Sequence, residues 1–171
     1  MTVESEFLGY SITKLRQESA YIEACLKRLT TEQVWMRGGE SQNAIGNLLL
    51  HLTGNVRQWI LAGVGGVEIQ RDRDGEFAAR GGMGPGELTA DLQVAVEGAV
   101  RIIQALPAGR LVERVNIQGH EVSVLEAIYH VVEHFSGHTG QVILLTKSFT
   151  DSDMGFYGYL NSPGGAAGRK P

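Results

Sequence analysis

The stretch SVLEAIYHVVEHFSGHTGQVILLTKSF, residues 123–149, decides the fold. It opens with Ser123 followed three residues later by Glu126, a capping-box signal that marks the start of a helix. Beyond this signal, apolar side chains recur at the helical period and share one stripe: Ile128, Val132, Phe135 and Val142. The sequence therefore predicts an amphipathic helix that runs to about Phe149 and buries one face.

Three further segments show the same helical spacing of apolar side chains. They run from about Glu6 to Leu29, from Asn43 to Val64 and from Pro85 to Pro107. Proline is tolerated in the first turn of a helix, so Pro85 can open the third segment. A short helical turn capped by Thr31 follows the first. Four long amphipathic helices predict a mainly all-α protein with the architecture of a four-helix bundle.

The segments between the helices carry different signals. Residues 67–84 are rich in glycine and alternating charge and show no clear helical or strand period. At ~3.3 Å per residue this connection can cross the whole bundle, so the helix order need not be simple up-and-down. Between Leu111 and Val122 the apolar period changes to two around Gln118-Gly119, which predicts a short β-hairpin before the last helix. We expect residues 1–150 to form the bundle domain and residues 151–171 a loosely ordered tail.

The composition excludes several classes of protein. The net charge is −4 and the basic side chains are dispersed, whereas nucleic-acid binders usually carry a basic stripe. No apolar run approaches the ~20 residues of a membrane span, and the first residues do not resemble a signal peptide. The single cysteine, Cys25, rules out an internal disulfide and a four-cysteine zinc site. We therefore expect a cytoplasmic protein that binds neither nucleic acid nor membrane.

Histidines are the most informative chemical groups in the chain. His130, His134 and His138 follow one another at steps of four in the last helix, and imidazoles at i and i+4 can hold one metal ion. The helical phase places His134 and His138 on the flank of the apolar stripe and turns His130 toward the back. His51 lies on the matching flank of the second helix. The predicted ligands are therefore His51, His134 and His138.

Three imidazoles with an open position are typical of a catalytic metal site, and they suit Zn or Ni. The same spacing is also compatible with ordinary hydrogen-bonded histidines at the edge of a core. Small residues near the ligands, Gly54, Gly137 and Gly140, favour a close helix approach or an open cavity. His120 lies in the hairpin, where we expect it to be exposed.

The sequence reveals no catalytic side chain. The segment from His134 to His138 lacks the glutamate that a zincin uses as general base, and no acid or base is evident beside the histidines. Cys25 falls in the apolar pattern of the first helix, which predicts a buried thiol. Any attacking group is therefore expected from outside the chain.

Two segments, NAIGNLLLHL at 43–52 and HFSGHTGQ at 134–141, resemble the DinB/YfiT-like superfamily of metalloenzymes. This resemblance spans about residues 5–150 and implies a bundle that holds a divalent ion through His51, His134 and His138. It also implies a homodimer. Many relatives carry arginine at the position of Thr139. If that arginine binds an anionic ligand in the relatives, this protein lacks the group that does so. Around the ligands we expect supporting polar groups: Asn47, Asn55, His130 and Gln141.

The resemblance also suggests a function. Characterised relatives include transferases and an isomerase that use low-molecular-weight thiols such as bacillithiol and mycothiol. We therefore expect a metal-dependent enzyme that activates either a small thiol, as an S-transferase, or water, as a hydrolase, and acts on a small-molecule substrate. The alternative is a stress-related protein that binds a metal or ligand without turnover.

Overall fold

The computed structural model describes residues 2–158, which fold mainly into helices. Four long helical stretches dominate: α1 (Val3–Leu26), α3 (Ile45–Val56) with its continuation η1 (Arg57–Val64), α5 (Pro85–Ala105) and α6 (Val124–Thr150). Shorter elements connect them: α2 (Thr31–Trp35), α4 (Arg73–Ala78), the 3₁₀-helix η2 (Ala108–Val112), and strands β1 (Arg114–Ile117) and β2 (His120–Ser123). The predicted bundle with a hairpin before the last helix is confirmed.

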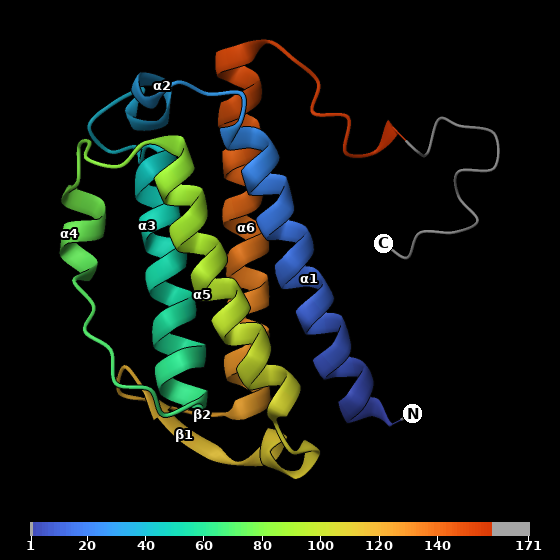
Figure 1. Ribbon diagram of the computed structural model, residues 1–171. Helices are drawn as coiled ribbons and strands as arrows, with labels where there is room; N and C mark the ends of the chain where they lie inside the picture. Colours follow the sequence, from blue (N-terminus) through green and yellow to red (C-terminus); the bar gives the residue numbers. More distant parts are fainter. Residues whose placement is uncertain (1, 159–171) are drawn as a thin grey trace.

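The long helices form a closed ring of neighbours. Helix α1 packs against α5 and α6, and α3 packs against the same two helices. Figure 1 shows that α3 and α5 begin at the same end of the bundle and run in parallel, because the connection carrying α4 returns along the outside of α3. The predicted crossing connection is therefore present, and the helix order is not simple up-and-down.

The core is built from the predicted apolar stripes. Phe135 of α6, Leu15 and Ile22 of α1 and Leu49 of α3 are almost completely buried. Full burial of such a side chain contributes about 1.5–3 kcal/mol, so this shared core supplies most of the driving force for helix packing. Cys25 is also buried, as predicted.

Local signals fix the start of α6. The backbone N–H of Glu126 donates to Ser123 Oγ at 3.1 Å, and the N–H of Ser123 donates to Glu126 Oε2 at 2.6 Å. These two bonds satisfy otherwise unpaired donors at the helix N-terminus. The predicted capping box is therefore confirmed.

The hairpin forms at the predicted turn. Strands β1 and β2 pair antiparallel, with Ile117 opposite His120. Gln118 and Gly119 between them have φ values of 54° and 82°, as a two-residue turn with both central residues in the left-handed region requires. His120 is exposed, as expected.

The second helix changes its winding midway. The α-helical pattern of α3 gives way at Arg57 to the wider π-helix η1, and the N–H of Gly65 donates five residues back to Ile60 at 2.9 Å. A Cβ on Gly63 would overlap Ile117, so this glycine lets the hairpin pack tightly on η1. The sequence predicted one regular helix here, because π segments leave no distinct periodicity.

The connection between η1 and α5 is ordered and contains a short helix. This helix is α4, and Asp72 accepts a hydrogen bond from the N–H of Gly75 at 2.9 Å at its start. The sequence did not predict this helix. Six residues are too few to show a helical period, and contacts with α3 stabilise the turn instead.

The residues after α6 lie against α1. The rings of Tyr21 and Phe156 stack with centroids 4.2 Å apart, and Arg28 donates to the carbonyl of Asp153 at 2.9 Å. The rest of the expected tail, residues 159–171, lies outside the described residues, so its looseness stays a prediction. Among residues 2–158, no helix has the length and apolar character needed to cross a lipid bilayer.

Candidate metal centre

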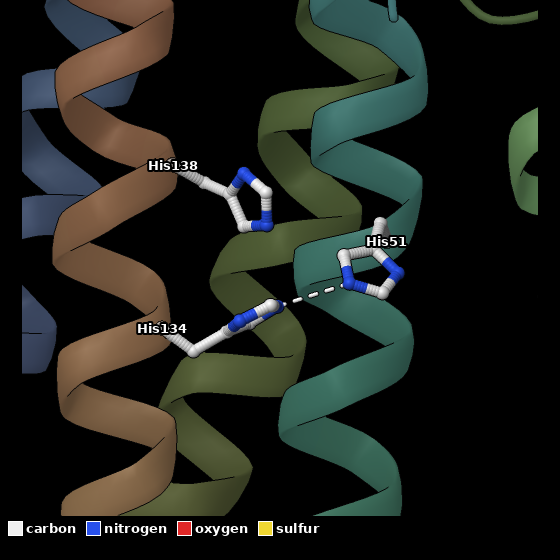
Figure 2. A group of neighbouring side chains, drawn as sticks. All are labelled: His51, His134 and His138. Carbon is white, nitrogen blue, oxygen red and sulfur yellow. Dashed lines mark hydrogen bonds between the residues drawn. The ribbon is translucent and has the colours of Figure 1, made fainter.

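Three histidine rings converge in the space between α3 and α6. His51 comes from α3, and His134 and His138 come from successive turns of α6 (Figure 2). The ring centroid of His51 lies 5.0 Å from that of His134 and 5.4 Å from that of His138, and the last two are 4.5 Å apart. The Nε2 atoms of His51 and His134 face each other at 3.0 Å. The structure thus brings together the three side chains predicted as ligands.

The spacing of the nitrogens suits a single ion. One ring nitrogen from each histidine lies within 4.8 Å of the other two, so a common point exists no more than about 2.8 Å from each (4.8/√3). Imidazole–zinc bonds are ~2.0–2.1 Å long, so modest side-chain rotation brings all three nitrogens into bonding range. Three nitrogen donors also leave at least one coordination position for an exogenous ligand.

The environment keeps the imidazoles of His134 and His138 neutral. Burial, together with the nearby His138 and His51, lowers the pKa of His134 to about 4. Burial also lowers the pKa of His138, although its bond to Gln141 opposes that effect. A neutral imidazole has a free electron pair, so His134 and His138 are available as metal ligands at neutral pH.

Hydrogen bonds orient the rings of His51 and His138. Nδ1 of His51 lies 3.0 Å from Oε2 of Glu76, and Nδ1 of His138 lies 2.7 Å from Oε1 of Gln141. Both partner oxygens accept hydrogen bonds, so they favour a proton on Nδ1 and a bare Nε2 that faces the other rings. Gln141 therefore contacts and orients the candidate ligand His138.

Glu76 is an acid beside the histidines that the sequence did not reveal. It belongs to α4, and its carboxylate also binds Arg71 through Nε at 2.6 Å and Nη2 at 2.8 Å. Burial raises the pKa of Glu76, but the hydrogen bonds from Arg71 and His51 outweigh that effect and bring it below its usual value. An acid therefore does lie beside the histidines, and it was not evident in the sequence because the chain folds back over α3.

In the sequence, Gly54 was the indication that another segment approaches α3 closely near His51. It lies three residues after His51 on the same face of α3, and a Cβ there would overlap the Glu76 carboxylate and press on Arg71 Nε. The glycine thus allows a close approach, as predicted, although the approaching segment is the connection rather than another bundle helix. Gly137 and Gly140 have open space in the Cβ direction.

Asn47 binds the backbone of the segment that carries Glu76. Its side-chain amide donates to the carbonyls of Glu76 at 2.8 Å and Ala79 at 3.0 Å, and its oxygen accepts from Arg37 at 2.6 Å. No hydrogen bond from Asn47 to His51 occurs in residues 2–158. Asn47 therefore holds the backbone that carries Glu76 rather than a ligand itself.

His130 and Asn55 form a separate pair below the cluster. Asn55 Nδ2 lies 3.4 Å from His130 Nε2, and the His130 ring packs on Trp59 with centroids 4.1 Å apart. His130 is not among the three convergent nitrogens, although its ring stacks on His134 at 5.5 Å. The pair thus packs beneath the candidate ligands.

Two neighbouring hollows open beside the cluster. The first has a volume of about 350 Å³ and is lined by residues of α6: His130, Glu133, His134, Gly137, His138 and Gln141. The second, of about 330 Å³, adds neutral polar and apolar side chains: Ser41, Gln42, Asn43, Leu48, Leu144 and Leu145. Gln141 lines both hollows, so a ligand near His138 has room to extend along α6.

Thr139 does not face these hollows. It is buried and donates to the carbonyl of Phe135 at 2.9 Å. Burial raises the pKa of Glu18 on α1, and a hydrogen bond with Thr139 opposes that effect. Position 139 therefore faces α1 rather than the histidines. The presence of threonine instead of arginine at this position does not take a cationic group away from the candidate metal site.

Comparisons with known proteins agree with this architecture. A DinB-like protein from Bacillus cereus ATCC 10987 is 15% identical with a TM-score of 0.63 over 77% of this chain and 85% of its own. A conserved protein from Enterococcus faecalis is 13% identical with a TM-score of 0.69, covering 86% and 96%. The DinB-like protein YjoA from Bacillus subtilis is 13% identical with a TM-score of 0.66 over the same shares. At these identities the likeness shows the fold alone.

A family model described as "Protein of unknown function (DUF1572)" matches residues 2–158. No curated protein matches the chain significantly. The structural matches confirm the DinB-like fold that the resemblance of residues 43–52 and 134–141 implied. The chain therefore belongs to the DUF1572 family, and it has the DinB-like fold with a three-histidine cluster that could hold a metal ion.

Proposed function

We propose that this protein is a metal-dependent enzyme in which His51, His134 and His138 bind one divalent transition ion. The observation that carries this proposal is the convergence of three ring nitrogens within 4.8 Å beside an open hollow. Two of the rings are oriented by acceptors at Nδ1, an arrangement common among metal-binding histidines. Zn or Ni fits best, since first-row metals of this kind favour imidazole.

The single cysteine of the chain is not available as a nucleophile for the chemistry. Cys25 is buried in α1, and burial raises the pKa of its thiol, so it is both inaccessible and protonated. We infer that the attacking group is an exogenous thiol or water. A bound divalent ion lowers the pKa of such a ligand and presents it as thiolate or hydroxide.

The residues around the hollow then have distinct tasks. Glu76 and Gln141 hold His51 and His138, while the helix faces exclude water from one side of the cluster. Glu133 is the acidic side chain that lines the hollow, and its carboxylate can accept a proton from the attacking group. The second hollow offers neutral polar and apolar contacts to the rest of a substrate.

Between the two chemistries we favour thiol transfer, on the resemblance to thiol-dependent relatives, with hydrolysis as the second candidate. We further propose a cytoplasmic homodimer that acts on small molecules. The net charge of −4 with dispersed basic residues supports an enzyme that binds neither nucleic acid nor membranes. A metal- or ligand-binding protein without turnover is the alternative outcome of the test.

The test is to load the metal-free protein with Co²⁺ and add neutral and anionic small thiols while recording the visible spectrum. The thiol-transferase proposal predicts a sulfur-to-metal charge-transfer band and calorimetric heats that vary with buffer ionisation enthalpy, because the thiol loses its proton. Hydrolysis of model esters without thiol would favour the hydrolase instead. Metal binding with neither response would leave the non-catalytic alternative.

A further inference from the structure

We propose that Glu76 is a positioning residue: it fixes His51 in the tautomer with a proton on Nδ1, which leaves Nε2 bare and directed toward His134 and His138. This inference rests on the proposed metal site and extends it to the connection between η1 and α5. It assigns that connection a role in preparing a ligand.

The contacts of His51 Nδ1 distinguish between its tautomers. Two groups approach this atom, Glu76 Oε2 at 3.0 Å and Arg71 Nη2 at 3.1 Å. A guanidinium only donates hydrogen bonds, whereas a carboxylate only accepts them. Arg71 Nη2 has other acceptors within reach, Glu76 Oε2 at 2.8 Å and the carbonyl of His51 at 3.4 Å. The Glu76 carboxylate therefore accepts a hydrogen bond from the Nδ1–H group of His51.

The ion pair that holds the carboxylate is buried and geometrically fixed. The side chains of Arg71 and Glu76 are only 8% and 10% exposed, and two Arg71 nitrogens bind the two carboxylate oxygens. The third nitrogen of Arg71 donates to Gln58 Oε1 at 2.7 Å, which ties the pair to η1. A two-point contact of this kind leaves the carboxylate little freedom to leave His51.

The surrounding sequence is arranged for this approach. Gly54 leaves the space on α3 that the carboxylate occupies, and Asn47 holds the carbonyl of Glu76 at 2.8 Å. Both positions lie within one turn of His51 on the same helix. Side chain and backbone of Glu76 are thus placed by separate contacts.

The tautomer of His51 has a consequence for His134. Their Nε2 atoms lie 3.0 Å apart, so when His51 Nε2 is bare, the hydrogen of this contact belongs to His134. Metal loading then requires only the proton of His134 to move from Nε2 to Nδ1 of the same ring. If His51 carried its proton on Nε2 instead, metal loading would have to move that proton to Nδ1, where the Arg71 guanidinium offers no acceptor.

The substitution Glu76→Leu provides a directional test, because leucine offers no acceptor to Nδ1 of His51, whereas a glutamine oxygen would. Without an acceptor there, Arg71 Nη2 is the polar group at Nδ1, and as a donor it favours the tautomer protonated on Nε2. We expect Zn²⁺ affinity to fall roughly 10- to 100-fold, the range for loss of a group that supports a ligand. Glu97→Leu is the matched control, because it removes the carboxylate from another Arg–Glu pair, that of Arg16; its Zn²⁺ affinity should match that of wild type.

The deciding measurement is ¹⁵N NMR of the imidazoles in metal-free protein at pH 7.5. Wild type should show His51 protonated on Nδ1, and Glu76→Leu should show the proton moved to Nε2. Should Glu76→Leu fold poorly, the double variant Arg71→Leu/Glu76→Leu removes the unpaired guanidinium, and it should recover folding but not the wild-type tautomer preference.

A wild-type His51 protonated on Nε2, or a Glu76 variant with unchanged tautomer and affinity, would overturn the proposal. If the tautomer shifts as expected but wild type binds no metal, the proposed function fails while the positioning contact stands.

Discussion

At the scale of single residues, the site depends on which imidazole nitrogen carries a proton and on how closely Glu76 can approach. His134 and His138 stay neutral because burial lowers the pKa of both rings. Because Gly54 has no side chain, α3 leaves room there for the Glu76 carboxylate that contacts His51.

The substitution Gly54→Ala should weaken metal binding. An added Cβ overlaps the Glu76 carboxylate, so the Arg71–Glu76 pair has to move away from His51. We expect a loss of Zn²⁺ affinity on the order of 10-fold, similar to removal of a group that supports a ligand. Gly140→Ala is the matched control, since open space surrounds that position and alanine favours a helix by ~1 kcal/mol. Equal affinity in the two variants, measured by chelator competition, would argue against a tight fit at Gly54.

The metal-free protein should lose stability as the pH falls from about 6.5 toward about 4. The folded state lowers the pKa of His134 to about 4, so the unfolded chain binds more protons in this window. Protonation then favours unfolding, and the stability present above pH 6.5 is progressively lost. Urea unfolding at several pH values measures this effect, which His134→Gln should reduce. A slope with pH that is the same in His134→Gln and wild type would show that another group is responsible.

Among the helices and strands, the sequence predicted those features that depend on contacts between residues close together in the chain. Ser123 and Glu126 mark the start of α6, and Gln118-Gly119 marks the hairpin turn, because each contact joins residues at most three positions apart. The three candidate ligands also followed from helical phase. Glu76 did not, because it reaches His51 from 25 residues away through a connection whose short helix has no periodic signature.

The connection between η1 and α5 should resist proteolysis while Asn47 is intact. Asn47 joins the backbone of Glu76 and Ala79 to α3 and also binds Arg37. Asn47→Ala leaves several buried polar groups without partners, at about 1–3 kcal/mol for each. We expect much faster trypsin cleavage after Arg71, Arg73 or Arg80 in this variant. Asn43→Ala, at an exposed position just before α3, is the control and should behave as wild type. Rapid cleavage of wild type at these sites would contradict an ordered connection.

At the scale of the whole molecule, the crossing connection and the bundle together create the site. Helices α3 and α6 pack against each other and bring His51 beside the pair on α6. Because the chain returns along the outside of α3 to begin α5, α4 lies outside α3 (Figure 1), and its Glu76 contacts Nδ1 of His51 while His134 contacts Nε2. The fold thus places a proton acceptor on one side of His51 and the candidate ligands on the other.

The metal content per chain tests whether His51, His134 and His138 bind one ion. Metal-free protein is incubated with Zn²⁺, freed of excess ion and analysed by elemental mass spectrometry, alongside single alanine variants. We expect one ion per wild-type chain, near-complete loss in His51→Ala and His138→Ala, and full retention in His120→Ala and His130→Ala. Unchanged metal content in His51→Ala or His138→Ala, or equal loss in His130→Ala, would contradict it.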